Sequence, residues 1–508
     1  MIDSNKIRKS VRALLFVIAN TLIYGLGFTL SEFVGSPVGG VNDVAVLSFQ
    51  WAAITFATFG LLYLLSLNRY IFAIIFPLLT TLCTVLTYFR YTANVTLTPM
   101  LIDLALINDA RTNMQVISLQ LIVIIILTLI LSVAIVWYRW KKIRFSYVWL
   151  HALLAVGIVY TTNYKIQALS RPLSERMPHS LFYNLRRYMD ERAVATASRD
   201  TFTIPSTANS DSLTVVFVVG ESLRSDHLQI NGYHRTTTPN LANEKNVVSL
   251  PNIHTVPCFT HVSVPHIFTR ADSLNPKRAF SEQSFVTIFK QAGFRTSWLA
   301  NQESVATYVY FMNECDTLIY ANSGKSMYVF DEWLDEALLP DYCNELNNAN
   351  CKQLIILHTI GSHWWYNSHY TKEFERYTPT ISSRVISSNS KEEMINSYDN
   401  TILYTDYFIK SVIESLRNRK AILFYLSDHG ECLGEDGYFT HGIDRPQLHN
   451  PAAFVWYSDS YAAEFSDNIE NLKENSLRHY HSDYLFHSII DAADISSPYM
   501  QPEFSIFE

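Results

Sequence analysis

Five long stretches without a charged side chain are the feature that most limits what this chain can fold into. Each lacks Asp, Glu, Lys and Arg for roughly the 20 residues that a helix needs to cross a bilayer: Ala13–Ser31, Val44–Asn68, Tyr70–Phe89, Asn113–Tyr138 and Phe145–Tyr164. One buried helix of a soluble protein can be this apolar, but five in succession are not expected there. The first stretch is long for a signal peptide and four more follow it, so we interpret it as an anchor. The pattern predicts a five-helix transmembrane domain over residues 1–164.

The positive charges of the short loops predict the orientation of these helices. With the N-terminus inside the cell, nine Lys and Arg residues lie in inner segments, and only Arg90 and Arg111 lie in outer loops. The nine are Lys6, Arg8, Lys9, Arg12, Arg69, Arg139, Lys141, Lys142 and Arg144. Because the number of predicted spans is odd, everything after Tyr164 is expected outside the cytoplasm.

The remaining chain is predicted to consist of a connector and a water-soluble domain. Residues 165–212 carry mixed charge, Pro172 and Pro178, which favours short surface-lying helices followed by a polar linker. Residues 213–508 hold most of the histidines. Over the whole chain the charged fraction is 17% and the hydrophobic fraction 49%, which excludes disorder as the main state. The net charge of −7 argues against a general nucleic-acid binder.

Short apolar runs alternate with helical stretches in the soluble part. The predicted strands are Leu213–Val219, Thr296–Ala300, Gln353–His358, Ala421–Ser427 and Ala453–Tyr457. Helices are predicted over Ser284–Gln291 and Glu393–Arg417. This alternation predicts an α/β domain whose largely parallel sheet is covered on both faces. In such sheets, polar chemistry collects at the carboxyl ends of the strands.

Metal-binding side chains follow two of these predicted strands. Glu221 follows the first run, and the adjacent pair Asp428 and His429 follows the fourth. Zinc binds such carboxylate oxygens and imidazole nitrogens. Three further histidines near strand ends or loops give a surplus of ligands for one or two divalent ions: His358, His363 and His441. The alternatives are a helix cap for Glu221, and salt bridges or hydrogen-bonded core histidines for the others.

A nucleophile is available in the segment from Pro257 to Pro265. Cys258, Thr260 and Ser263 all precede a helix predicted over Val264–Arg270. Backbone amides at a helix N-terminus favour an anion, although most hydroxyl side chains there are only caps. The segment alone leaves the choice among the three open.

Together these residues resemble the phosphoethanolamine transferases of the alkaline-phosphatase superfamily, bacterial inner-membrane enzymes that modify lipid A or other surface glycans. The resemblance covers nearly the whole chain. It rests on the block from Val218 to Pro239, on Ser427-Asp-His-Gly-Glu431 with Leu433-Gly-Glu435 and Thr440-His-Gly442, on His358-Thr-Ile-Gly-Ser-His363, and on Asn396-Ser-Tyr-Asp-Asn400.

The resemblance implies a role for each matching residue. It implies one or two zinc ions held by Glu221, Asp428 and His429, with Thr260 as both ligand and nucleophile. His363 and His441 match histidines that serve the substrate phosphate or a second zinc. Asn108 and Thr112 match residues of a loop that contacts the lipid donor. Cys343 and Cys351 match a family disulfide.

The implied function is transfer of phosphoethanolamine from a membrane phospholipid such as phosphatidylethanolamine to lipid A, a core sugar of lipopolysaccharide, or a glucan. The catalytic domain would lie in the periplasm. The chain departs from the family at Val116, where an acidic residue is usual, and at His266, where a cysteine is frequent. The run Trp298–Gln302 is closer to members that act on core sugar or glucan than to lipid A enzymes.

Three alternatives remain. A phosphoglycerol transferase shares the membrane-plus-α/β plan, but the block Asn231-Gly-Tyr-His-Arg-Thr-Thr-Thr-Pro239 favours the ethanolamine family. A soluble-type sulfatase is disfavoured because no Cys or Ser stands in the C/S-x-P-x-R form. A non-catalytic membrane receptor would be expected to have lost part of the metal set, which is complete here.

Overall fold

The computed structural model describes residues 1–508 except 1–3, 35, 94, 100, 103–105, 107–117, 326–330, 349–351 and 442–443. The chain forms two compact units. Unit 1 comprises Met1–Met189 with the short segments Gly324–Val329 and Ser383–Val385, and unit 2 comprises the remainder. The first helices of the predicted connector therefore pack with the membrane helices.

Unit 1 is helical. Its helices are α1 (Ser4–Tyr24), continued by the π-helix Gly25–Thr29 and the 3-10 helix Leu30–Phe33, then α2 (Val41–Leu67), α3 (Arg69–Ala93), α6 (Leu119–Lys142), α7 (Val148–Tyr160) with the π-helix Thr161–Lys165, α8 (Gln167–Glu175), and α9 (His179–Ala195), which runs on into unit 2. Many of their large apolar side chains are exposed, as expected of helices that face lipid. Short helices were predicted for the connector without exact bounds, and α8 and α9 are such helices.

Four of the five predicted spans appear among the described residues as helices long and apolar enough to cross a membrane. They cover Asn5–Phe33, Val41–Leu67, Arg69–Thr92 and Leu119–Lys142. The fifth prediction corresponds to α7, which has 13 residues. Its polar continuation, Thr161–Lys165, is a π-helix, so the apolar part of this span is shorter than the uncharged stretch indicated.

The start of α6 also differs from the prediction. The uncharged stretch begins at Asn113, but the helix begins at Leu119. The Ser118 hydroxyl accepts a hydrogen bond from the Leu121 amide at 3.1 Å, so Ser118 caps the helix.

Unit 2 is built on a seven-stranded sheet with the strand order β3-β11-β8-β2-β7-β5-β6. The strands are β2 (Thr214–Gly220), β3 (Val247–Ser249), β5 (Arg295–Ala300), β6 (Thr317–Tyr320), β7 (Gln353–His358), β8 (Ala421–Ser427) and β11 (Ala453–Tyr457). The five strands from β8 to β6 in this order run parallel, whereas β11 is antiparallel to both of its neighbours. All five predicted strands are present, and the largely parallel sheet is confirmed.

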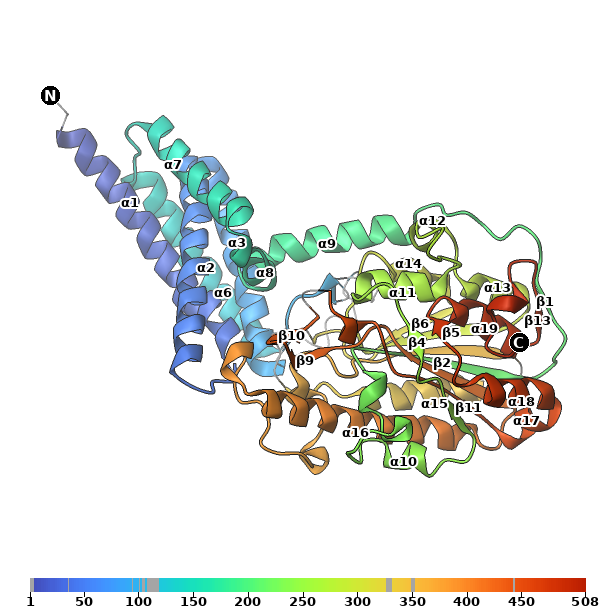
Figure 1. The fold of residues 1–508 in the computed structure, drawn as a ribbon. Helices are drawn as coiled ribbons and strands as arrows, with labels where there is room; N and C mark the ends of the chain where they lie inside the picture. The colour runs from blue at the N-terminus through green and yellow to red at the C-terminus, as the bar shows by residue number, and fades with distance from the viewer. Residues whose placement is uncertain are drawn as a thin grey trace. The chain divides into compact units, whose positions relative to one another are not determined.

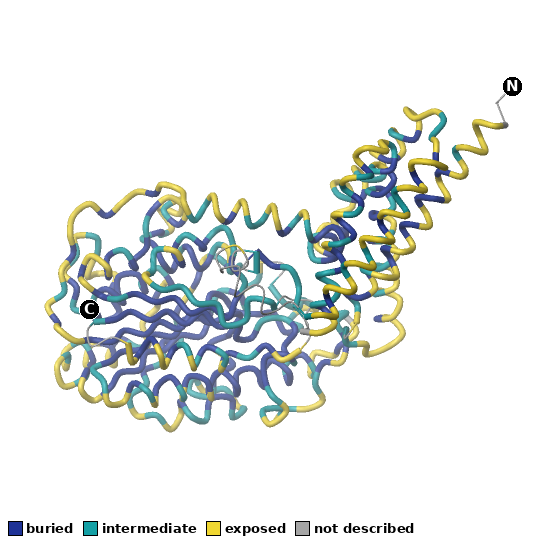
Figure 2. Tube along the Cα trace, turned by 180° about the vertical axis from the view of Figure 1, so that it is seen from behind, coloured by how far each residue is buried: buried dark blue, intermediate teal, exposed yellow. Residues whose placement is uncertain are grey.

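Helices cover both faces of this sheet (Figure 1). Alternate residues of β2 point to opposite faces, so Phe217 packs in one core and Val218 in the other. The first core contains side chains of α11 (Thr260–Phe268), α13 (Phe285–Gln291), α14 (Val309–Glu314) and α19 (Tyr484–Ala492). The second contains side chains of α10 (Pro239–Ala242), α15 (Leu339–Asn348) and α16 (Lys391–Leu416). The inner strands of the sheet, such as β2 and β8, are buried as a result (Figure 2).

The smaller elements of unit 2 lie outside the main sheet. Three two-stranded sheets pair β1 (Thr207–Ala208) with β13 (Ile495–Ser496), β4 (Ile253–His254) with β12 (Tyr480–His481), and β9 (Cys432–Glu435) with β10 (Tyr438–Thr440). The remaining α-helices are α12 (Arg278–Ser281), α17 (Asp459–Glu464) and α18 (Ser466–Asn475).

Helix α11 begins earlier than the sequence predicted. It starts at Thr260 and not at Val264, because the Phe259 carbonyl accepts hydrogen bonds from the amides of Val262 and Ser263 at 2.9 and 2.8 Å. Thr260 is therefore the first residue of the helix, and Ser263 lies within it instead of capping it.

Candidate active site

The parallel register brings the polar strand ends of unit 2 together. Gly220 at the end of β2 is opposite Ser427 at the end of β8, and Val219 is opposite His358 at the end of β7. The Asp428 amide then donates to the Gly220 carbonyl at 3.1 Å. Glu221 and Asp428, which are 207 positions apart in the chain, consequently leave the sheet side by side.

Glu221, Asp428 and His429 form a buried group whose ligand atoms all lie within 4.8 Å of one another. His429 Nε2 is 3.7 Å from Glu221 Oε1 and 3.4 Å from Asp428 Oδ2. Its other ring nitrogen, Nδ1, donates to the Gly430 carbonyl at 2.7 Å, which leaves the Nε2 lone pair facing the carboxylates. Two carboxylates and one neutral imidazole are ligands that zinc prefers.

Asp428 supports the assignment of a cation to this group. Its Oδ1 accepts hydrogen bonds from the amides of Ser222 and His429, at 3.1 and 2.8 Å. Its Oδ2 is buried and accepts no hydrogen bond from any described residue. Burial and the neighbouring Glu221 raise the pKa of Asp428 to about 6. A buried carboxylate oxygen without a partner is costly, and a metal ion would satisfy it. The residues present therefore fit a zinc ion.

Thr260 lies against this group. Its Oγ1 is 3.1 Å from Glu221 Oε2 and 3.3 Å from His429 Nε2, so its proton can be donated to either. The other two hydroxyl or thiol candidates face elsewhere. The Ser263 hydroxyl donates to the Pro257 carbonyl at 3.0 Å, and Cys258 packs in a small apolar cluster that includes Cys432. Burial raises the pKa of the Cys258 thiol, which disfavours a thiolate.

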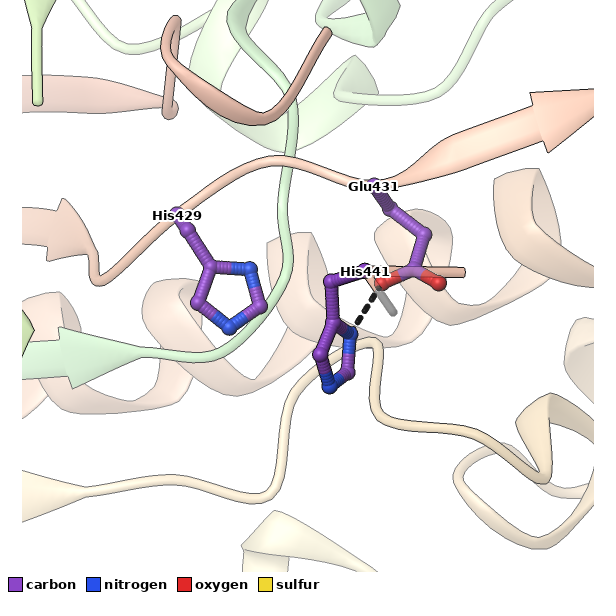
Figure 3. A group of neighbouring side chains, drawn as sticks. All are labelled: His429, Glu431 and His441. Atoms are coloured by element: carbon purple, nitrogen blue, oxygen red, sulfur yellow. Dashed lines mark hydrogen bonds and ion pairs between the residues drawn. The ribbon is translucent and has the colours of Figure 1, made fainter. Parts of the chain in front are cut away.

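His441 directly follows β10, and its side chain lies beside those of His429 and Glu431 (Figure 3). Its ring centroid is 4.7 Å from that of His429, and its Nδ1 is 3.0 Å from Glu431 Oε2. These three residues form a second group whose ligand atoms lie within 4.8 Å. Burial alone would lower the pKa of His441, but the carboxylates of Glu431, Glu221 and Asp428 together raise it to about 9.

Of the two remaining predicted histidines, one lies near the site and one lies in the core. The ring of His363 is 6.4 Å from that of His441, and its Nδ1 donates to the Trp364 carbonyl. His358 is buried between the edges of Trp298 and Tyr308 and belongs to neither ligand group. Burial lowers the pKa of His358 to about 4, so it is a neutral core histidine.

Three residues of the site were not identified from the sequence. Gln302 Nε2 donates to Glu221 Oε2 at 2.9 Å, and the Ser222 hydroxyl donates to Glu221 Oε1 at 2.7 Å. Glu431 fixes His441, as described above. Gln302 stands two residues beyond the end of β5, so the rule of polar strand ends could have identified it. Asn108, Thr112 and Cys351 lie outside the described residues, and Cys343 is exposed on α15.

Comparison with known proteins decides the family. The sulfatase family profile matches residues 213–495, which is more than half of the chain and includes every described residue of the site. The chain belongs to the sulfatase family. In this sulfatase-family protein, Glu221, Asp428 and His429 therefore lie at strand ends within the domain that the family profile matches.

Several curated relatives are phosphoethanolamine transferases by name. Kdo(2)-lipid A phosphoethanolamine 7''-transferase of Escherichia coli K12 is 37% identical over 276 residues, which is 51% of this chain and 47% of that protein. Phosphoethanolamine transferase EptA of the same strain is 31% identical over 304 residues, 56% of this chain and 54% of that protein. The chain thus spans about half the length of the curated relatives it matches.

Solved structures match the fold. The soluble domain of lipooligosaccharide phosphoethanolamine transferase A from Neisseria meningitidis is 28% identical, with a TM-score of 0.54, over 61% of this chain and 97% of that one. The integral membrane form matches 97% of this chain and 98% of that one, with a TM-score of 0.55 at 23% identity. The periplasmic domain of EptC from Escherichia coli, solved in complex with Zn, is 25% identical, with a TM-score of 0.54, over 60% of this chain and 90% of that one. The architecture of membrane helices plus an α/β domain is confirmed.

Proposed function

We propose that this protein is a zinc-dependent transferase that moves phosphoethanolamine from a membrane phospholipid to an envelope glycolipid or glycan. The observation that carries the proposal is the position of the Thr260 hydroxyl, within 3.3 Å of both Glu221 and His429 at the edge of the sheet. The names of the relatives support the chemical group transferred, and the apolar helices of unit 1 support a lipid donor.

The first half-reaction forms a phosphothreonine. Thr260 Oγ1 attacks the phosphorus of the phosphatidylethanolamine headgroup, and the bond between phosphorus and the diacylglycerol oxygen breaks. The hydroxyl proton of Thr260 passes to Glu221 Oε2, to which it is already hydrogen-bonded. Glu221, Asp428 and His429 would hold the zinc ion, and the positive charge that it would supply when bound would lower the pKa of the attacking hydroxyl and stabilise the phosphoryl oxygens.

Histidine completes the proton transfers. The departing diacylglycerol oxygen needs a proton, which His441 can donate because Glu431 holds its ring in position. In the second half-reaction a hydroxyl or phosphate of the acceptor attacks the phosphorus, the bond between phosphorus and Thr260 Oγ1 breaks, and Glu221 returns the proton to Thr260. His441 then takes up the acceptor's proton, and His363, whose ring is 6.4 Å from that of His441, is proposed to contact the same phosphoryl group. All atoms and protons balance over the two steps.

The proposed location follows from the reaction and the charge pattern. The donor lies in a bilayer, so anchoring the enzyme there raises the effective concentration at which the two meet. We place the protein in a bacterial inner membrane with unit 2 in the periplasm, as the nine inner and two outer positive charges predict. We also propose that Asn108 and Thr112 contact the phospholipid donor.

The test is a set of three variants of the full-length protein in a strain that lacks its own phosphoethanolamine transferases. Thr260→Ala should abolish transfer and the phosphothreonine, while zinc content and folding are retained. Cys258→Ser and Ser263→Ala should keep measurable activity, because neither side chain faces the metal group. Mass spectrometry of lipid A, core and glucans would identify the acceptor. A phosphate found on Ser263 or Cys258, or glycerol phosphate in place of phosphoethanolamine, would overturn the proposal.

A further inference from the structure

Arg445, in unit 2, is a cation without an ion-pair partner among the described residues. Its Nε is buried and donates no hydrogen bond within the described part of the chain. The adjacent Asp444 is engaged elsewhere, with its Oδ1 2.6 Å from His449 Nε2. Glu435 of β9 accepts a hydrogen bond from Arg224 at 2.6 Å. A buried donor without an acceptor is costly, so this guanidinium indicates a place for an anion that the chain itself does not supply.

An aromatic ring holds this guanidinium in place. Arg445 lies over the ring of Tyr438, 3.6 Å from its centroid. Tyr438 belongs to β10 and, like Phe259, packs against the small apolar cluster that contains Cys258 and Cys432. A guanidinium that stacks on an aromatic face is restricted in its motion, while the N–H groups at its edge stay available to a ligand.

The same contacts place Arg445 beside the reacting groups. Phe259 immediately precedes Thr260, and its ring is 6.5 Å from that of His441. His441 directly follows β10, the strand that carries Tyr438, and Arg445 comes four residues after His441. The segment that provides His441 therefore also provides Arg445, on the side of the site where the Phe259 ring lies.

The chemistry of the two substrates indicates which anion this arginine meets. In the proposed function, the zinc group, His441 and His363 already contact the phosphoryl group that is transferred. The phospholipid donor carries only that one phosphate, so Arg445 is left for a phosphate of the acceptor. A planar guanidinium binds phosphate through two parallel hydrogen bonds, which makes arginine well suited to this contact. A neutral glucan would leave its charge unmatched.

We propose that Arg445 binds a phosphate group of the acceptor, so that the acceptor is a phosphorylated glycolipid or sugar and not a neutral glucan. This inference rests on the proposed transferase function and names its acceptor class. Arg445 belongs to neither metal-ligand group, so the contact contributes to binding of the acceptor and not to the attack by Thr260.

The experiment measures equilibrium binding of lipopolysaccharide, untreated or treated with phosphatase, to the full-length, zinc-loaded protein in nanodiscs. All proteins carry Thr260→Ala, so that nothing reacts during the measurement. Adding Arg445→Ala should weaken binding of the untreated lipopolysaccharide about tenfold and leave that of the treated one unchanged, because a charge-assisted contact to phosphate is lost. Arg445→Lys should recover part of the loss. The matched control is Arg376→Ala, an exposed arginine whose guanidinium lies 5.9 Å from the Tyr377 ring centroid.

A second measurement, with Thr260 intact, follows formation of the phosphothreonine from phosphatidylethanolamine. Arg445→Ala should form it at the wild-type rate, and slower formation would show that Arg445 contacts the donor instead. Unchanged binding in Arg445→Ala, or an equal loss for treated and untreated lipopolysaccharide, would overturn the acceptor site. If wild type forms no phosphothreonine but the tenfold binding difference is found, the transferase mechanism fails and the phosphate site is supported.

Discussion

Replacing Gln302 with alanine tests whether the zinc group depends on the hydrogen bonds around its ligands. Gln302 Nε2 donates to Glu221 Oε2 at 2.9 Å. Gln302 is 8% exposed and Glu221 is 1% exposed. Because Glu221 is almost fully buried, water replaces the lost donor poorly. A hydrogen bond to a charged group contributes about 1.5–3 kcal/mol, and about 1.4 kcal/mol corresponds to a tenfold change in affinity.

Two other donors limit the loss. Ser222 still donates to Oε1 of Glu221, and Thr260 still donates to Oε2. We therefore expect Gln302→Ala to weaken zinc binding by about tenfold, the lower end of the range for partners of metal ligands. Gln302→Glu should weaken zinc binding or transfer more strongly, because it places a second carboxylate against Glu221. Gln291→Ala is the matched control, since its amide donates only to the Phe202 carbonyl at 2.7 Å.

The assay is competition between the purified protein and a zinc chelator of known affinity, followed by transfer activity at saturating zinc. Gln302→Ala should lose affinity and regain part of its activity when zinc is raised. Wild-type affinity in Gln302→Ala, with the protein folded, would refute the reasoning that this donor fixes Glu221. An equal loss in Gln291→Ala would show that the effect is on folding.

Three further predictions address other parts of the chain. Removing zinc with a strong chelator should abolish transfer and lower the unfolding temperature, and activity that survives full removal would exclude the metal mechanism. Cys343 and Cys351 should be joined in protein isolated from the periplasm, which non-reducing peptide mapping would detect, and two free thiols would contradict it. Asp399→Ala should cost about 1–3 kcal/mol of stability, because it leaves the buried His227 without its hydrogen-bond partner and Arg235 with only its hydrogen bond to Asn396. The exposed Asp459→Ala is its control, and an equal shift of the unfolding midpoint in both would refute the argument.

The strands that position the site could be predicted because they are buried on both faces. A short, continuous apolar run such as Ala421–Ser427 is typical of a strand that is buried on both faces. The strands that the sequence did not reveal, Val247–Ser249 and Thr317–Tyr320, are short and lie at the two edges of the sheet. Only partly buried, they lack a continuous apolar signal.

The site was predictable where its residues are adjacent in sequence and less so where the fold brings them together. Asp428 and His429 are adjacent in the sequence, so a short sequence motif is enough to identify them. Gln302 reaches Glu221 only because β5, β7 and β2 are neighbours in the sheet. No local sequence pattern predicts that strand order. The start of α11 at Thr260 was missed because Ser263, a residue type that often caps helices, stands directly before Val264, whereas the residue at the actual N-cap, Phe259, has no capping side chain.

The zinc group also explains how a fold can keep two carboxylates buried side by side. Glu221 and Asp428 are each 1% exposed, and burial near each other disfavours two negative charges, as the raised pKa of Asp428 indicates. Glu221 is compensated by the donors Gln302, Ser222 and Thr260, but Asp428 Oδ2 receives no hydrogen bond from any described residue. A divalent cation would remove this imbalance, so metal binding and the stability of the strand ends should be coupled. The arrangement that is costly without a cation is the same one that places Thr260 beside it.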